Sequence, residues 1–426
     1  MIYPFLFFGL VLLFLIATWR NPRRAIFLLF ACLPAYLLRL DVFGMPTTLL
    51  EWMLGMAMLA WLTDPVRQKI DGSFLRGWRL PLFLFFLASL VGFFVAPDKL
   101  VALGIWKAYV IEPVFFFLLV RISLRWYDDA QTVVMALGCG AAVVAAFAIF
   151  QSVTGLGIPI PWDVERRVTS VYPYPNAVGL YVGPIILLGL AALSRGVKER
   201  IPSRIFFWIL VLGLCVAAVI FSQTEAVWGA VPAAVLVLMI GLFPRLRLLA
   251  VPLALAGILV MLAVPALRTK ALLHDYSGEV RRKQWTETAE MLKDRWAFGA
   301  GLSGYPAVMA AYHVFPEIEI FQYPHNIFLN IWSEFGLLGF LVLAMLTWRV
   351  LRLYRKADRE RSPMLWLTFG CVAALVEMFL HGFVDVPYFK NDLALLTWGI
   401  FALLSWSATG RFGEPEKREG GTIFAS

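Results

Sequence analysis

The sequence is poor in cysteine and histidine. Its 426 residues include only four of each. The cysteines stand singly in four different apolar runs, at Cys32, Cys139, Cys215 and Cys371, and no C-x-x-C spacing occurs. This pattern predicts neither a disulfide framework nor a zinc knuckle. We expect all four to be small buried hydrophobic side chains.

The sequence also begins without the features of a secretory signal. The first apolar stretch, IYPFLFFGLVLLFLIATW, lacks both a basic segment before it and a small-residue cleavage site. We therefore expect it to be retained as a membrane segment. A length-based count of soluble domains does not apply to a chain of this kind.

Apolar residues dominate the composition. They make up 61% of the chain, against about 45–50% in an ordinary soluble domain, and the mean hydropathy is +0.78. Many runs approach or exceed the roughly 20 residues that span a bilayer. We predict an all-α polytopic integral membrane protein with about 12–13 transmembrane helices. The predicted spans are 2–18, 25–38, 48–62, 80–95, 104–120, 131–151, 176–193, 205–221, 225–243, 249–264, 327–348, 363–383 and 392–408.

The connecting loops alternate in basic content, which predicts a topology. Most lysines and arginines lie in one set of loops, which the positive-inside rule places in the cytoplasm. That set is 19–24, 63–79, 121–130, 194–204, 244–248, 349–362 and the tail from 409. Loops 152–175, 265–326 and 384–391 then lie outside, the C-terminus lies inside, and the N-terminus lies outside if all thirteen spans exist. The net charge of +9 is thus mainly a topology signal, and we expect no nucleic-acid partner.

One outer loop, 265–324, is long enough to form a structured helical cap. Loops of about this length tend to be functional. A helix is predicted from Glu279 to Arg295, followed by a second short helix near Pro306–Phe315. Glycines between them end the first helix and allow close backbone approach, at Gly299, Gly301 and Gly304. The inner stripe of the first helix is predicted to be Val280, Trp285, Ala289 and Leu292.

Two groups of cations lie in the outer loops. Arg281, Arg282 and Lys283 begin the cap helix, and Arg166 with Arg167 stands in the loop before residue 176. Guanidinium groups bind phosphate oxygens in bidentate fashion and keep their charge. Together with the membrane location, this indicates a lipid-linked phosphate or diphosphate. The alternative is that these arginines contact lipid headgroups or pair with Asp163, Glu165 and Glu279.

His325 is the most suggestive single residue. It lies between Pro324 and Asn326, directly before the apolar run of QYPHNIFLNIWSEFGLLG. Asn326 is a good N-cap for the next helix. A neutral imidazole at the membrane interface can accept a proton from a sugar hydroxyl. The alternative is that His325 only caps or packs against the helix start, and we interpret His274 and His313 as surface or packing residues.

Several ionisable residues are predicted in or at the ends of spans, where such groups are costly and therefore candidates for function. Lys107 is expected to share a cavity with Glu112, and Lys390 is the best further cation for a phosphate. His381 and Asp385 are spaced to interact if their helix continues. For each of these residues, structural pairing is the alternative to a substrate role. The set is Glu51, Lys107, Glu112, Glu377, His381, Asp385 and Lys390.

Several stretches resemble the O-antigen ligase and O-antigen polymerase superfamily, and they occur in the family's order. They are RVTSVYPYPNAVGLY, VRRKQWTETAEMLKDRWAFGAGLSGY, PHNIFLNIWSEFGLLGF and HGFVDVPYFKNDLALLTW, which together cover roughly 165–405. The family consists of bacterial membrane glycosyltransferases whose donor is a glycan on undecaprenyl diphosphate. The resemblance implies a GT-C-like fold in the bacterial inner membrane, with the active site facing the periplasm or exterior.

Carried onto this sequence, the resemblance implies that Arg167 and Arg281 hold the donor diphosphate. His325 would be the catalytic base or would orient the acceptor hydroxyl. Transfer would invert the anomeric centre without a metal or cofactor, which agrees with the lack of a carboxylate cluster in the outer loops. One departure is SQTEAVWG, where Glu225 stands in place of an expected arginine. Further substrate contacts are expected from Arg282, Asn176, Asn326, Lys390 and Lys107.

We predict four regions: 1–264 and 325–408 as two parts of the membrane bundle, 265–324 as the cap, and 409–426 as a polar cytoplasmic tail. The expected partners are a polyprenyl-diphosphate-linked glycan, membrane lipids, and an acceptor that is a lipid, a glycan or a protein. Ligase and polymerase activity both fit this sequence. The alternative function is a transporter or flippase for a glycolipid or small anion.

Overall fold

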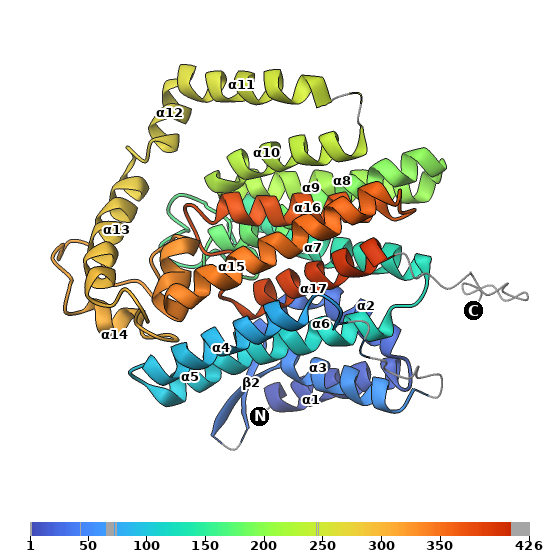
Figure 1. The fold of residues 1–426 in the computed structure, drawn as a ribbon, viewed down its shortest axis with the longest axis horizontal. Coiled ribbons are helices and arrows are strands. Elements are labelled where there is room, and N and C mark those ends of the chain that lie inside the picture. Colours follow the sequence, from blue (N-terminus) through green and yellow to red (C-terminus); the bar gives the residue numbers. More distant parts are fainter. Residues whose placement is uncertain are drawn as a thin grey trace, which may run out of the picture.

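The computed structural model describes residues 2–42, 44–64, 72, 75–243, 245 and 247–409. Within these ranges the chain forms a bundle of helices with a cap across one end (Figure 1). The first half comprises α1 (Ile2–Thr18), α2 (Pro22–Ala31), α3 (Leu49–Leu62), α4 (Arg79–Val95), α5 (Lys99–Trp106), α6 (Glu112–Ser123), α7 (Tyr127–Thr154), α8 (Asn176–Glu199) and α9 (Pro202–Ser222). The second half comprises α10 (Glu225–Leu242), α11 (Arg247–Ala263), α12 (Pro265–Ala271), α13 (Tyr276–Asp294), α14 (Tyr305–Met309), α15 (Ile327–Arg359), α16 (Leu365–His381) and α17 (Asn391–Thr409).

The helical, polytopic character expected from composition is confirmed. Helical segments stand at all thirteen predicted positions. Among the described residues, six continuous helices are long and apolar enough to cross a membrane, or seven if the bent segment of α11 to α13 counts as one. The apolar helices α1, α3, α4 and α16 are shorter than that limit. α5 and α6 form one span, because the short π-helix η3 (Lys107–Ile111) joins them.

Two local features differ from the predicted pattern of spans. The stretch 25–38 is not one helix. α2 ends at Ala31, and a 3-10 turn, η1 (Leu33–Leu37), follows with Pro34 at its start. A small antiparallel hairpin comes next, in which β1 (Arg39–Val42) pairs with β2 (Met45–Thr48) and Arg39 lies opposite Thr48. Thr48 then caps α3 by accepting a hydrogen bond from the backbone N–H of Glu51 (3.2 Å).

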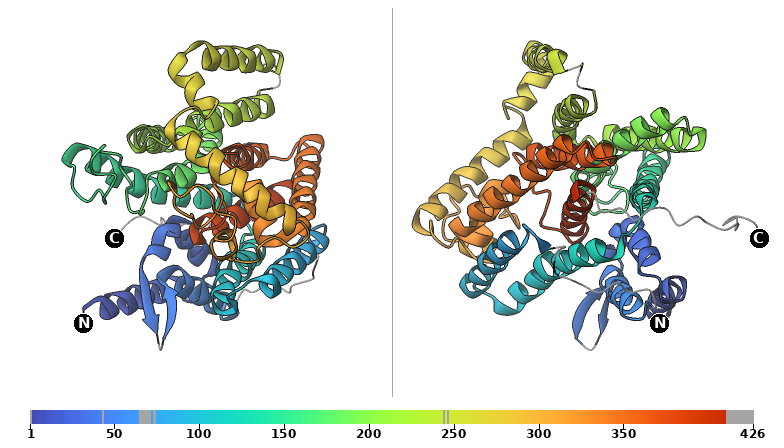
Figure 2. Two further views of the ribbon diagram at one scale, coloured as in Figure 1. Left: turned by 90° about the vertical axis from the view of Figure 1, so that its left-hand side faces the viewer. Right: turned by 45° about the vertical axis from the view of Figure 1, so that its right-hand side comes forward.

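The cap lies across the end of the bundle, where α13 crosses in front of the helix ends (Figure 2). Asp275 caps α13 by accepting from the N–H of Gly278 (3.1 Å). α13 matches the predicted helix, whereas the second cap helix is confined to the five residues of α14. The predicted inner stripe was wrong in part: Ala289 is exposed, and the buried face consists of Gly278, Gln284, Glu287, Thr288, Met291 and Leu292. Apolar periodicity missed this face because half of its side chains are polar.

A break in α15 receives the glycine-rich segment of the cap. Gly336 has φ +61°, which interrupts the helix and leaves nearby carbonyls free to accept other donors. The carbonyl of Ser333 accepts from the N–H groups of Ala300 (2.8 Å) and Gly301 (3.0 Å). Gly301 has φ +80°, and a Cβ there would lie 2.4 Å from the backbone N of Ala96. The predicted close approach at the glycines is confirmed.

The core of the bundle is one large apolar cluster formed by buried side chains from most of the membrane helices. The cap has a separate small cluster of Met291, Leu292, Ala300, Tyr305 and Met309. Cys215 and Cys371 are buried as expected, whereas Cys32 is partly exposed and Cys139 is exposed. The predicted tail beyond 409 and parts of the loops 63–79 and 244–248 lie outside the described residues.

Candidate active site

His325 is held at the junction between the cap and α15. Its backbone φ is +43°, an uncommon conformation for a residue with a side chain. From α13, Gln284 Nε2 donates to the carbonyl of Tyr323 and Trp285 Nε1 donates to that of Pro324, both at 2.8 Å. On the other side, Asn326 caps α15 by accepting from the N–H groups of the second and third residues that follow it. The backbone around His325 is thus fixed from both directions.

The imidazole of His325 pairs with a buried carboxylate. Its Nδ1 lies 3.3 Å from Oδ1 of Asp385, in the loop between α16 and α17. Asp385 is 1% exposed, and its Oδ1 also accepts from the N–H of Val386 (2.8 Å). Burial alone would raise the pKa of Asp385. The hydrogen bond and charge of His325, with the charges of His381 and Arg281, outweigh burial and hold that pKa below its usual range.

This pairing determines which nitrogen of His325 can act on a substrate. An ionised carboxylate can only accept a hydrogen bond, so Nδ1 of His325 carries the proton that faces Asp385. Nε2 of the neutral ring then has a free lone pair. The side chain of His325 is 23% exposed, so the ring is not sealed inside the protein. In that form of the ring, the tautomer and orientation of His325 are set by Asp385.

A chain of hydrogen bonds extends from Asp385 to Arg167. Asn176, the first residue of α8, donates from Nδ2 to Oδ2 of Asp385 (3.2 Å). Nη2 of Arg167 donates to Oδ1 of Asn176 (3.4 Å) and to the carbonyls of Ser222 (3.3 Å) and Gln223 (3.4 Å). Residues far apart in the sequence therefore meet here. Within the described residues, Arg167 forms no ion pair with Asp163 or Glu165, the alternative partners in its own loop.

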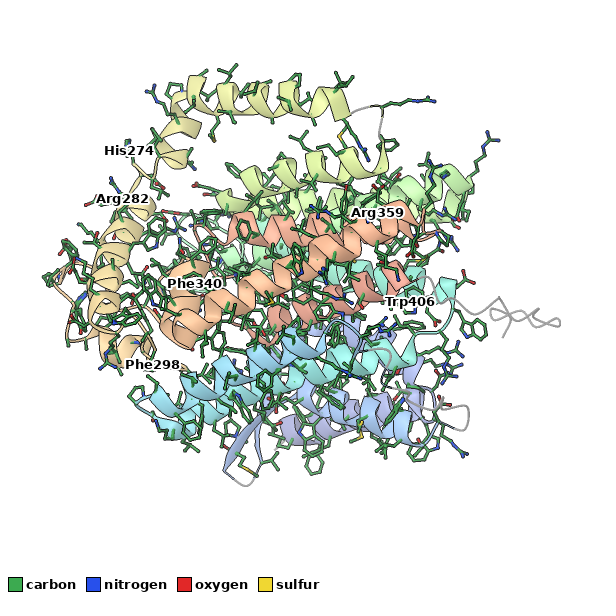
Figure 3. All side chains as sticks on the ribbon, viewed as in Figure 1. His274, Arg282, Phe298, Phe340, Arg359 and Trp406 are labelled. Carbon is green, nitrogen blue, oxygen red and sulfur yellow. The ribbon has the colours of Figure 1, made fainter. Side chains whose placement is uncertain are left out.

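The two neighbouring cap arginines face different environments. Arg281 is partly buried, and its Nη1 donates to the hydroxyl of Ser277 (2.8 Å). Its charge lowers the pKa values of Asp385 and of Arg167. Arg282 is exposed on the cap (Figure 3). Lys283 is bound by two carboxylates, Glu279 and Glu317, each at 2.8 Å.

Lys390 approaches the site from the loop before α17. Its Nζ lies 3.7 Å from the ring centroid of Tyr174, whose hydroxyl is 3.1 Å from that of Tyr323. Tyr323 in turn makes an edge contact with the ring of His325, with centroids 4.9 Å apart. Burial lowers the pKa of Lys390 to about 8, opposed by the charge of Asp392. Lys390 therefore loses its charge more readily than an exposed lysine.

Lys107 does not join this group. Its Nζ pairs with Glu51 at 2.8 Å and with Glu112 at 3.8 Å. The structure thus favours the structural alternative for Lys107, which neutralises two carboxylates on neighbouring helices. Asn326 is also engaged: besides capping α15, its Nδ2 donates to the carbonyl of Phe383 (2.9 Å).

Glu287 organises the part of the cap that leads to His325. This buried side chain accepts from the N–H groups of Val314 (2.7 Å) and Phe315 (3.0 Å), and lies 3.2 Å from Nδ1 of His313. His313 is thus a packing residue, as expected, and His274 is exposed. A carboxylate on α13 therefore fixes the return segment of the cap.

The sequence placed Asp385 among the candidate ionisable residues but did not predict His325 as its partner. The spacing to His381 suggested a contact between those two side chains, but α16 ends at His381, whose Nδ1 lies 3.2 Å from Glu377 on the same helix. Asp385 is thereby free to face His325. The carbonyls of Ser222 and Gln223 could not have been found from side-chain chemistry. No group of three His, Cys, Asp or Glu that could hold a metal is present in the described part of the chain.

One known family resembles part of this chain. Residues 208–344 match the family model described as O-antigen ligase. This part of the chain is therefore similar to the O-antigen ligase family. The match runs from α9 through the cap into α15, so it includes Arg281 and His325. No curated protein matches this sequence.

The match to the O-antigen ligase family supports a membrane glycosyltransferase type of activity that uses a lipid-linked glycan and an acceptor. Glu225, which stands where an arginine was expected, makes a contact between the bundle and the cap. Glu225, at the start of α10, forms an ion pair with Lys270 of α12, and the Lys270 ammonium also lies 5.5 Å from the ring centroid of Trp228. The acid at this position thus attaches the cap to α10.

Proposed function

We propose that this protein transfers a glycan from a polyprenyl diphosphate to an acceptor hydroxyl at the capped end of the bundle. The observation that carries the proposal is the His325–Asp385 pair, because Nδ1 of His325 faces the carboxylate and, when the ring is neutral, Nε2 is the nitrogen that can accept a proton. The family relationship supports the same class of reaction.

In the proposed reaction, the acceptor hydroxyl gives its proton to Nε2 of His325 as its oxygen attacks the anomeric carbon. The new C–O bond forms on the face opposite the diphosphate. The bond between the anomeric carbon and the diphosphate oxygen breaks, and its electron pair leaves with the diphosphate. The product is therefore inverted, and the imidazolium is stabilised by the carboxylate of Asp385.

Arg281 and Arg167 would bind the diphosphate and stabilise the charge that grows on it. Guanidinium groups suit this role because they bind phosphate oxygens through paired donors and remain charged. Arg167 is already oriented by Asn176 and by two carbonyls, so little reorganisation is needed when the donor arrives. Lys390 is the third proposed cation, since its ammonium lies over the ring of Tyr174, whose hydroxyl contacts that of Tyr323.

We further propose that the capped end faces the periplasm or exterior of a bacterial inner membrane. Support comes from the opposite end, where the exposed basic residues of α15 lie, because positive loops favour the cytoplasm. A cysteine at exposed Arg282 and one at exposed Arg359, each in a background without the native cysteines, would test this. We expect a membrane-impermeant thiol reagent to label the first and not the second in intact cells.

The direct test of function is glycan transfer by purified protein in detergent. The donor is a polyprenyl-diphosphate glycan, and the acceptors are a glycolipid, a second donor molecule and a protein, supplied in separate reactions. We expect transfer to one class of acceptor, with inversion, and an unchanged rate in EDTA. Folded protein that transfers to none of the acceptors would contradict the proposal, and an EDTA-sensitive rate would contradict its metal-independent form.

A further inference from the structure

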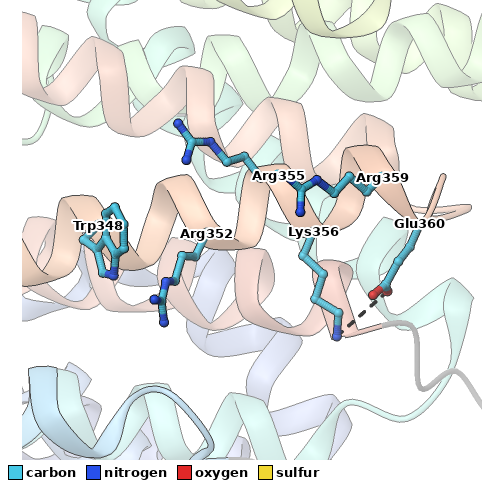
Figure 4. Close-up of a pocket in the computed structure, with 6 residues that line it drawn as sticks. All are labelled: Trp348, Arg352, Arg355, Lys356, Arg359 and Glu360. Atoms are coloured by element: carbon cyan, nitrogen blue, oxygen red, sulfur yellow. Dashed lines mark ion pairs between the residues drawn. The ribbon is translucent and has the colours of Figure 1, made fainter.

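A cluster of cations lines a pocket at the end of α15 opposite the cap. Its six lining residues are Trp348, Arg352, Arg355, Lys356, Arg359 and Glu360, which lie on successive turns of the helix (Figure 4). Four cations therefore face a single carboxylate. All six side chains are exposed, so a ligand can reach them without rearrangement of the core.

Most of this positive charge is not neutralised by the described part of the chain. Lys356 lies 3.9 Å from Glu360, and the Arg352 guanidinium lies 4.8 Å from the ring centroid of Trp348. Within the described residues, Arg355 and Arg359 form no ion pair. The pocket therefore offers two uncommitted guanidinium groups one helical turn apart.

A nearby arginine on the same helix shows that this exposure is specific to one face. Arg349 is partly buried, donates to the carbonyl of Arg76 (2.9 Å) and lies 5.5 Å from the ring centroid of Trp78. It thus belongs to the packing between α15 and the start of α4. If this end of α15 needed basic residues only to favour a cytoplasmic position, those residues could lie on either the packed or the outward face of the helix. The pocket arginines instead remain available on the outward face.

The outward face of α15 also provides an apolar surface that leads to the pocket. Leu337, Leu341 and Trp348 are 42%, 44% and 47% exposed and recur at helical spacing. Trp348 lies at the boundary, because it lines the pocket and continues the apolar stripe. Tryptophan is favoured at membrane interfaces for its apolar body and polar N–H. An apolar stripe that ends in a basic pocket matches a molecule with acyl chains and an anionic head.

We propose that this pocket binds the phosphate headgroup of an anionic phospholipid whose acyl chains lie along α15. Arg355 and Arg359 contact the phosphate oxygens, and Trp348 packs at the level of the glycerol. Basic pockets beside membrane helices recognise such headgroups. Inorganic phosphate has the same oxygens but none of the apolar contacts, so the lipid binds more tightly. The site is independent of the proposed glycan transfer at the capped end.

Native mass spectrometry of the purified full-length chain tests the proposal. The probes are phosphatidylglycerol and phosphatidylcholine with identical acyl chains, and inorganic phosphate in a separate titration. The variants are R355Q/R359Q and, as a second removal of charge, R352Q/R355Q. The control is R24Q/K198Q, which removes two exposed cations that form no ion pair within the described residues, from loops predicted to lie at the same end.

We expect phosphatidylglycerol to bind wild type at least 10-fold more tightly than phosphatidylcholine does. R355Q/R359Q should lose about 10-fold in phosphatidylglycerol affinity, R352Q/R355Q should lose several-fold, and the control should keep the wild-type value. Equal binding of the two lipids, or an equal loss in the control, would overturn the proposal.

Two further outcomes would also overturn it. Inorganic phosphate that competes at the same concentration as the lipid would mean that the site binds a free anion. Residues 410–426 contain three glutamates beside three basic residues, and these carboxylates are a second class of anion for the pocket. Phosphatidylglycerol binding that appears only after their removal would assign the pocket to that segment.

Discussion

The two ends of the helical bundle both carry arginines, but they hold them differently. At the capped end, Arg167 is bound by Asn176 and two carbonyls, and Arg281 by Ser277. At the opposite end, Arg355 and Arg359 are exposed and form no ion pair within the described residues. Charges with fixed neighbours suit chemistry that needs defined positions, whereas exposed charges suit contact with a fluid headgroup layer. The contrast shows that orientation, rather than the number of charges, distinguishes the candidate active site.

The largest expected effect comes from removing the imidazole at the capped end. His325→Gln should lower the rate of glycan transfer by about 10³-fold, because general base catalysis contributes roughly 10²–10⁴-fold. The matched control is His274→Gln, which alters an exposed histidine of the same cap. Initial rates with saturating donor measure both. A folded His325→Gln protein with the wild-type rate would remove His325 from the chemistry.

The second largest effect is expected from Arg281, and its neighbour Arg282 provides the comparison. Arg281→Gln should lower kcat/KM for the donor by roughly 10²-fold, since one oriented donor to a developing anion contributes this much. Arg282→Gln should cost at least 10-fold less, because its side chain points to solvent. Both variants lose one charge, so equal losses would mean that the net charge of the cap, and not orientation, governs donor binding.

Part of the candidate site could be predicted from the sequence. The apolar runs predicted the helices, and the glycines of the cap predicted the close backbone approach to α15. His325, Arg281 and Arg167 could be selected because the stretches that contain them resemble the O-antigen ligase and polymerase superfamily. Asp385 could not be assigned, because its partner depends on where α16 ends. The buried face of α13 was also missed, since Gln284, Glu287 and Thr288 bind neighbouring segments through polar contacts that hydrophobic periodicity does not register.

A pH effect is expected from Lys390. Its pKa of about 8 means that it is charged below that pH and neutral above it. Its contribution to donor binding is therefore present below pH 8 and lost as pH rises through 8. We expect kcat/KM of wild type to fall by several-fold between pH 7.5 and 9. Lys390→Arg should abolish that decline, because a guanidinium stays charged throughout; an unchanged profile would exclude Lys390 from donor binding.

The smallest expected effect concerns stability of the cap. Glu287→Gln should weaken the hydrogen bonds that hold 313–315, at a cost of about 1–3 kcal/mol in local stability. Hydrogen exchange at Val314 and Phe315 should accelerate, while exchange in the helices of the bundle stays unchanged. Glu290→Gln, on the exposed face of the same helix, is the control. Equal exchange in the two variants would show that Glu287 does not secure the return segment.

The central claim is that the polar groups at the capped end act as one site. A double-mutant cycle of transfer rates for His325→Gln, Asp385→Asn and their combination tests it most directly. Asp385→Asn alone should lose about 10²-fold, because an amide no longer fixes the tautomer of His325. We predict that the double variant loses no more than His325→Gln alone, because Asp385 acts through the imidazole. Losses that multiply in the double variant would contradict this account and mean that the two residues act separately.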